Sequence, residues 1–215
     1  MKILAIESSG SSLSIAISEN GNIVTEYFYN AGKIHSDVVV PLTEKIIKDA
    51  KWELKDIDKF AVSIGPGSFT GIRVAMSVIK TLAQTLSKPV VACDSLEILK
   101  NQLNIGKKET KIVPAIDALR NEVYVKQKNE IIIIPIEKFV KNLKKYNNIT
   151  VIGSAVFAYR NILQKELGKS SISLQQWQNF PRAATLALMA ENIDGVSFDK
   201  IEPIYGRKSW AEENK

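Results

Sequence analysis

The chain has 215 residues, of which 45% are hydrophobic and 24% are charged. That length is enough for one large domain or two smaller ones, each with its own core. No apolar run is long enough to cross a bilayer, and Glu7 interrupts the apolar N-terminal segment, so we expect neither a membrane helix nor a signal peptide. A single cysteine, Cys93, excludes an internal disulfide and favours a cytoplasmic protein.

The chain carries 29 basic and 23 acidic residues, a formal net charge of +6. Such a balance favours contact with anionic partners such as nucleic acid. The densest local excess is the segment 138–145, which contains Lys138, Lys141, Lys144 and Lys145. A lysine run of this kind is more typical of a solvated helix face, so it does not identify a partner by itself.

The first half of the chain alternates between strand and helix patterns. Asn20-Gly21 predicts a tight hairpin turn, because both central residues of such a turn need positive φ. Ser36 is expected to open the first helix, and Pro41 to shift or bend its start. The pattern predicts strands at 2–7, 12–18, 23–29, 59–64 and 89–92, and helices at 36–51, from Ser68 or Thr70 to about 87, and from Asp94 or Ser95 to about 103.

A polar segment at 104–110 interrupts the pattern and is the best linker candidate. A shorter cycle of strands and helices follows it. We expect strands at 111–116, 122–128, 130–134 and 150–152, helices at 138–146, 155–167 and 182–193, and a tail at 203–215. The element order predicts two α/β lobes with mixed, five-stranded-type sheets flanked by helices, at 1–103 and 111–215.

The most informative stretch is a strand-to-helix turn with three glycines. Glycine permits positive φ and a close backbone approach, and the start of a helix offers free N–H groups to an anion. The spacing is neither that of a Walker loop nor that of a dinucleotide fingerprint. A tight packing turn and an anion site therefore both remain open for the residues Gly65, Pro66, Gly67, Ser68, Phe69, Thr70, Gly71, Ile72 and Arg73.

The whole string resembles the glycine turn of the TsaB (YeaZ) family. Other segments match that family in the same order, namely 3–9, 35–42, 94–97, 115–124 and 205–208. Together they span nearly the whole chain. The departures are small: Glu7 stands where an aspartate is common, and Leu119 and Gly206 are not the usual residues.

The resemblance implies a fold of the actin-like ATPase and sugar-kinase superfamily. It also implies a non-catalytic scaffold, active in making threonylcarbamoyladenosine in tRNA with the catalytic subunit TsaD and the ATPase TsaE. TsaD would transfer the threonylcarbamoyl group from threonylcarbamoyl-AMP to N6 of the adenosine beside the anticodon. The chain would meet tRNA through this complex and form a homodimer when alone.

The residues allow an independent check of the non-catalytic expectation. His35 is the only histidine, so a two-histidine metal site cannot form, and we expect His35 to be a surface or capping residue. Asp94 and Cys93 are better explained as a helix cap and a small buried residue than as metal ligands. The turn 117–121 has no glycine, which disfavours close approach of its backbone to a triphosphate and leaves weak nucleotide binding open. We therefore expect no catalytic residue, no metal and no cofactor.

The helix expected at 36–51 and the helix that follows the glycine turn carry more apolar residues than one buried stripe requires. Either both faces are buried within this chain, or part of each helix forms an interface with the partner or with a second copy. The second interpretation predicts interface residues Val38, Leu42, Ile46, Val74, Ala75, Val78 and Leu82.

Two other function classes compete with the scaffold. A glycoprotease-type peptidase is one, although the sequence offers no metal pair and no convincing nucleophile and base. A small-molecule kinase is the other, although the second lobe lacks the glycines that its phosphate loops need.

Overall fold

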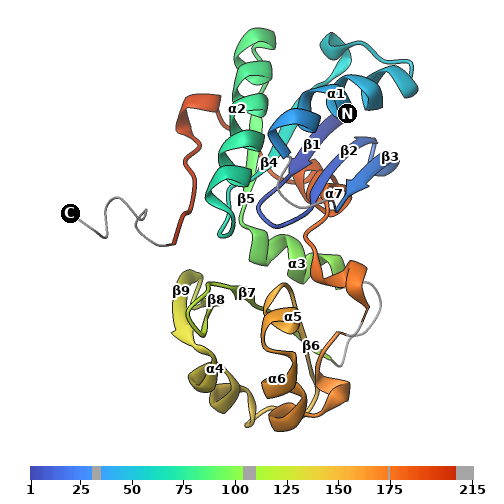
Figure 1. Cartoon of the computed structure of the whole chain (residues 1–215). Coiled ribbons are helices and arrows are strands. Elements are labelled where there is room, and N and C mark those ends of the chain that lie inside the picture. Colours follow the sequence, from blue (N-terminus) through green and yellow to red (C-terminus); the bar gives the residue numbers. More distant parts are fainter. Residues whose placement is uncertain (31–34, 104–109, 174, 207–215) are drawn as a thin grey trace, which may run out of the picture.

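The computed structural model describes residues 1–30, 35–103, 110–173 and 175–206. Figure 1 shows two α/β lobes, one above the other, with helix α3 (Ser95–Leu103) between them. The expected linker at 104–110 lies outside the described residues except for Thr110, as do Arg207, Lys208 and Trp210 of the tail. No helix in the described part of the chain is long and apolar enough to cross a membrane.

The first lobe is built on a five-stranded mixed sheet of order β3-β2-β1-β4-β5. The first three strands form an antiparallel meander, and β4 and β5 continue parallel to β1. Asn20 and Gly21 have φ of 48° and 75°, which confirms the predicted hairpin turn. The strands are β1 (Lys2–Glu7), β2 (Leu13–Glu19), β3 (Asn22–Tyr29), β4 (Lys59–Ser63) and β5 (Val90–Cys93).

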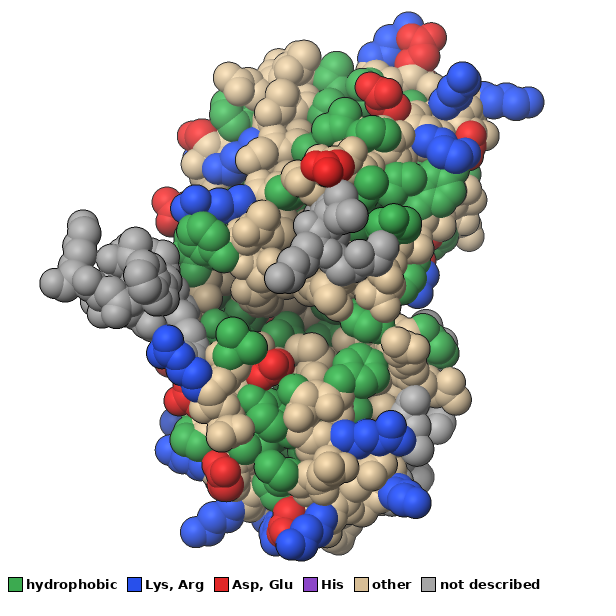
Figure 2. All heavy atoms as spheres, viewed as in Figure 1, with side chains coloured by type: hydrophobic (Ala, Val, Ile, Leu, Met, Phe, Trp, Pro, Cys, Tyr) green, Lys and Arg blue, Asp and Glu red, His purple; other side chains and the backbone are tan. Residues whose placement is uncertain are grey.

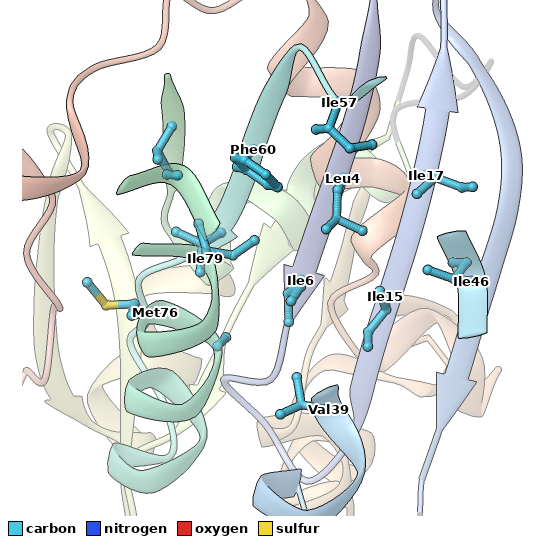
Figure 3. Close-up of a cluster of buried hydrophobic side chains, with 14 of the residues drawn as sticks. Leu4, Ile6, Ile15, Ile17, Val39, Ile46, Ile57, Phe60, Met76 and Ile79 are labelled. Carbon is cyan, nitrogen blue, oxygen red and sulfur yellow. The ribbon is translucent and has the colours of Figure 1, made fainter. Parts of the chain in front are cut away.

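Helices cover both faces of this sheet. One core joins Leu4 and Ile6 of β1 to α1 (His35–Asp49) and α2 (Phe69–Leu86), as Figure 3 shows for part of it. Alternate residues of a strand point to opposite faces, so Ile3 and Ala5 enter a second core on the other side. Burial on both sides explains why β1 reads as a continuous apolar run. Pro41 was expected to disturb the start of α1, but it lies inside the helix, which begins earlier at His35.

The second core is closed by a helix from near the end of the chain. Helix α7 (Ala183–Glu191) places Ala183, Leu186 and Ala187 against the strands of the first lobe. The sequence pattern had assigned this helix to a lobe at 111–215. We therefore propose a division in which the segment from Ala183 onward completes the first lobe.

The second lobe differs from the expected single sheet. Its strands form a parallel pair, β10-β6, and a separate antiparallel sheet, β7-β8-β9. Tyr159 separates α5 from α6, so the predicted helix at 155–167 is two helices. The elements are β6 (Lys111–Pro114), β7 (Ile116–Asp117), β8 (Glu122–Gln127), β9 (Glu130–Pro135), α4 (Ile136–Leu143), β10 (Ile149–Ile152), α5 (Ala155–Ala158) and α6 (Arg160–Leu167).

The described residues also form four short 3-10 helices, at Leu54–Asp56, Lys169–Ser171, Gln176–Asn179 and Phe198–Lys200. The expected class, two α/β lobes with helices flanking mixed sheets, is confirmed, and the split of the second sheet is the main correction. Helix α3 joins the lobes, because Leu96 and Leu99 pack with Ile116 and Tyr124 of the second lobe. Lys126 of β8 also pairs with Asp94 at 2.8 Å, next to the start of α3.

Candidate functional site

The glycine turn joins β4 to α2 and lies against the turn that connects β1 with β2. A Cβ added to Gly67 would lie 2.0 Å from the carbonyl oxygen of Ser9, and one added to Gly71 would lie 1.9 Å from that of Ser8. Real side chains do not tolerate such distances, so both positions require glycine. The glycines thus allow α2 to approach the first strand.

Hydrogen bonds fix this approach. The Ser68 N–H donates to the Ser9 carbonyl at 2.6 Å, and the Ser8 hydroxyl donates to the Gly71 carbonyl at 2.7 Å. Ser68 is the N-cap of α2, as predicted, and its hydroxyl accepts from the Gly71 N–H at 3.2 Å. The Ser68 and Gly71 N–H groups therefore bind groups of this chain, which favours the packing interpretation of the turn over an anion site.

A polar cluster lies beneath the turn, at the end of β1. Glu7 is fully buried and accepts hydrogen bonds from the backbone N–H (2.9 Å) and the hydroxyl of Ser9. The Ser95 hydroxyl donates to that of Ser9 at 2.7 Å and lies 2.9 Å from that of Ser63. Among the described residues, the second carboxylate oxygen of Glu7 has no hydrogen-bond partner. Desolvation by burial raises the pKa of Glu7 to about 7, although the hydrogen bonds from Ser9 oppose it.

This cluster holds the only serine-carboxylate pairing at the glycine turn among the described residues, and a substrate cannot reach it. Ser9, Ser63 and Ser95 are buried together with Glu7. Burial likewise raises the pKa of the Cys93 thiol to about 11, so the thiolate needed for nucleophilic attack is scarce. No group of three or more histidine, cysteine, aspartate or glutamate side chains suited to a metal ion occurs within the described ranges. The His35 side chain lies outside those ranges.

The turn at 117–121 in the second lobe takes a left-handed path without glycine. Leu119, Arg120 and Asn121 have φ of 62°, 53° and 59°. The Leu119 N–H donates to the Asp117 carboxylate at 2.9 Å, which also accepts from the Tyr159 hydroxyl at 2.7 Å. The Leu119 side chain is 69% exposed at the tip. The turn therefore carries a large apolar side chain, that of Leu119, on its solvent-accessible side.

An apolar groove of about 460 Å³ lies between α1 and α2. Its lining includes Val40, 48% exposed, and Phe69, 38% exposed. Large apolar groups that remain accessible together are typical of interaction surfaces. The full lining consists of Ser36, Val39, Val40, Phe69, Thr70, Arg73, Val74, Ser77 and Val78.

The groove contains part of the predicted interface. Val74 and Val78 line it, and Val38, Leu42 and Leu82 are partly buried against the core beside it. Ile46 and Ala75 are fully buried in the first core, so their prediction as interface residues was wrong. Sequence reasoning missed Val40 and Phe69. The run Val38-Val39-Val40 held the signal, because three consecutive helical residues cannot all face the same core.

Arg73 and two aromatic rings fix the C-terminal segment beside this groove. The Phe69 and Tyr205 rings lie 4.5 Å apart, and the Arg73 guanidinium lies 3.9 Å from the Phe69 ring centroid. Arg73 Nε also donates to the Tyr205 hydroxyl at 2.8 Å. Tyr124 of the second lobe donates to the Tyr205 carbonyl at 3.2 Å, so Tyr205 contacts both lobes.

Comparison with known proteins shows which families the sequence resembles. The TsaD family model, described as tRNA N6-adenosine threonylcarbamoyltransferase, matches residues 29–194. The chain is 28% identical to the tRNA threonylcarbamoyladenosine biosynthesis protein TsaB of Bacillus subtilis, over 99% of this chain and 96% of that protein. The TsaB protein of Buchnera aphidicola subsp. Acyrthosiphon pisum is 30% identical, over 75% of this chain and 79% of that protein.

Solved structures share the fold. A Pseudomonas aeruginosa protein described as similar to peptidase YEAZ has a TM-score of 0.77 at 23% identity, and covers 96% of this chain and 99% of its own. YeaZ from Pseudomonas aeruginosa has a TM-score of 0.74 at 23% identity, with 95% and 99% covered. Both lobes are therefore arranged as in these proteins.

Proposed function

Because the chain belongs to the TsaB (YeaZ) family, with its role in making threonylcarbamoyladenosine in tRNA, we propose that it serves there as a non-catalytic scaffold. In this proposal a TsaD-like subunit transfers the threonylcarbamoyl group from threonylcarbamoyl-AMP to N6 of the adenosine beside the anticodon. The chain supports that step from the cytoplasm, together with a TsaE-like ATPase, and needs no cofactor of its own.

One observation supports the non-catalytic part: N–H groups at the start of α2 already bind groups of this chain. The Ser68 N–H donates to the Ser9 carbonyl at 2.6 Å and the Gly71 N–H donates to the Ser68 hydroxyl at 3.2 Å. A phosphate group at the start of α2 would have to displace these acceptors, next to the cluster that contains the buried Glu7.

We place the partner on the groove between α1 and α2. Val40, Phe69 and Val78 offer accessible apolar surface there, and Arg73 adds a positive charge at its edge. Such a patch with a basic rim fits helix-to-helix packing with another chain. The same surface serves a homodimer of the free protein and the complex with the TsaD-like subunit, so the two assemblies exclude each other.

Reconstitution tests the scaffold. We expect no threonylcarbamoyladenosine from the purified chain with tRNA and threonylcarbamoyl-AMP, and product only when the TsaD-like and TsaE-like proteins are added. Omission of this chain from the full mixture should abolish product formation. Turnover of a peptide or a phosphate donor by the chain alone would instead support the peptidase or the kinase.

Substitution tests the groove. Val40→Glu and Val78→Glu each bring an unpaired carboxylate into the proposed interface, and its burial is unfavourable. We expect at least about 100-fold weaker binding to the TsaD-like subunit, measured by calorimetry. Gln84→Glu adds the same charge on an exposed position of α2 outside the groove and should bind normally. Wild-type affinity of both groove variants, with thermal unfolding unchanged, would refute the placement.

A further inference from the structure

A second cavity, on the lower lobe, carries a different chemistry from the groove. It has a volume of about 520 Å³ and lies where the second sheet is split, between β6 and β8. In the described structure no strand joins β6 to β8, so the gap between the two small sheets remains open. We propose that this cavity binds tRNA directly, with lysines on its phosphates and Tyr146 against a base. The proposal rests on the proposed function for the identity of the RNA.

The floor of the cavity is apolar and the rim is basic. Val125, Ile134, Phe139 and Leu143 form the buried floor. The lining includes five lysines and a single carboxylate, that of Glu97, and Figure 2 shows basic side chains around the edge of this lobe. The lysines are Lys100, Lys111, Lys126, Lys128 and Lys145.

Three of these lysines form no ion pair among the described residues, although two of them, Lys111 and Lys145, lie near the Tyr146 ring. Lys126 pairs with Asp94 at 2.8 Å and with Glu97 at 3.4 Å, and Lys100 pairs with Glu97 at 3.2 Å. Within the described residues, Lys111, Lys128 and Lys145 have no carboxylate partner, so their charges stay uncompensated at the rim. Lysine is a flexible point charge that contacts phosphates without reading sequence.

An aromatic ring stands next to these charges. Tyr146 is 41% exposed, with the Lys111 and Lys145 ammonium groups 3.9 and 5.3 Å from its ring centroid. Proteins that bind unpaired RNA combine a basic groove with aromatic side chains on which bases stack. The cavity therefore offers both contacts that a looped RNA needs within a few ångströms.

The arrangement of the charges favours RNA over a free nucleotide. A triphosphate is normally held by converging backbone N–H groups of a glycine loop or a helix start. No glycine is among the described residues that line this cavity, and the lysines without a carboxylate partner come from three separate segments, namely β6, the β8–β9 turn and the turn after α4. Charges distributed in this way suit several phosphates along a strand.

Binding of a labelled anticodon stem-loop to the full-length protein tests the proposal, with fluorescence anisotropy at several salt concentrations. We expect Lys111→Ala/Lys145→Ala to bind about 10-fold more weakly and to lower the slope of log K against log salt by about 0.7 for each lost contact. Tyr146→Ala should bind about 10-fold more weakly with a nearly unchanged slope, and Tyr146→Phe should restore binding.

Lys138→Ala/Lys141→Ala is the matched control, because it removes the same charge from exposed positions of α4 outside the cavity. It should bind within about 2-fold of the wild type. Equal losses in both double variants would overturn the proposal in favour of non-specific attraction. The proposal would also be overturned if polyglutamate competed with the labelled stem-loop as well as unlabelled stem-loop does, or if ATP alone displaced the stem-loop. Failure of the wild type to bind the stem-loop at low salt would overturn it too.

The same variants in the reconstituted mixture separate the two proposals. If cavity variants lose both RNA affinity and product formation, both proposals stand. If the chain is required but the cavity variants bind RNA and support product formation like the wild type, only the cavity proposal fails. If RNA binding follows the cavity but the chain is dispensable for product formation, only the scaffold fails.

Discussion

Each lobe has a tight turn beside an acidic strand end, and the two turns meet different surroundings. The glycine turn follows β4 and lies against the residues after Glu7 of β1, whereas the turn at 117–121 follows β7 directly. In the first lobe, Gly67 and Gly71 face the carbonyls of Ser8 and Ser9 at distances that leave no room for a Cβ. In the second lobe, Leu119 adopts a left-handed φ of 62° and extends its side chain into solvent.

The difference teaches that Gly71 is needed for proximity alone, whereas Gly67, with a φ of 154°, is needed for proximity and for its backbone conformation. A left-handed residue with a side chain costs on the order of 1 kcal/mol, which a stable lobe tolerates. A Cβ 1.9 Å from a backbone oxygen costs more, because α2 or the β1–β2 turn must move. The two acidic residues differ in burial: each carboxylate accepts two hydrogen bonds, but Glu7 is fully buried, whereas Asp117 is only partly buried.

The largest expected effect comes from filling the close contact. Gly71→Ala should lower the free energy of unfolding by about 4 kcal/mol, although alanine is the better helix former, because the added methyl overlaps the Ser8 carbonyl. Urea unfolding measures it. Gly10→Ala is the control, since its Cβ would meet only the Ser12 nitrogen at 3.9 Å. If Gly71→Ala changed the free energy of unfolding by less than about 1 kcal/mol, the close contact at Gly71 would not distinguish the glycine turn from the turn at 117–121.

The next effect concerns the buried carboxyl group of Glu7 and its dependence on pH. Burial raises the pKa of Glu7 from 4.5 to about 7, so the folded state keeps a proton that the unfolded chain has lost. Stability from this group is present below about pH 4.5 and is lost as the pH rises toward 7. The stability of Glu7→Gln relative to the wild type should therefore grow by about 3 kcal/mol from pH 4.5 to 8. A pH-independent difference in urea unfolding would contradict the buried titration.

The smallest effect concerns the exposed turn. Leu119→Gly relieves the left-handed strain but makes the unfolded chain more flexible, so we expect a gain in unfolding free energy of no more than about 1 kcal/mol. Thermal unfolding measures it, with Leu119→Ala, which keeps a Cβ, as the comparison. A loss of more than about 2 kcal/mol for glycine would mean that the Leu119 side chain contributes contacts beyond those of an exposed tip.

Local signals in the sequence predicted much of this structure. Asn20-Gly21 forms a turn with positive φ as expected, and of the alternative caps Ser68 and Asp94 are the residues that cap their helices. These features depend on neighbours in sequence. The packing of α7 on the first sheet and the burial of Ile46 and Ala75 depend on partners far along the chain. Periodicity identifies an apolar face but not the element that covers it.

Helix α7 has a consequence for the order of events during synthesis. The strands carrying Ile3, Ala5 and Ala16 leave the ribosome early, yet Ala183, Leu186 and Ala187, which cover them, are translated near the end. At about 5–20 residues per second, that apolar surface waits roughly ten seconds or more for its cover. This apolar face of the sheet therefore stays accessible to other chains for most of the time that the protein is being translated.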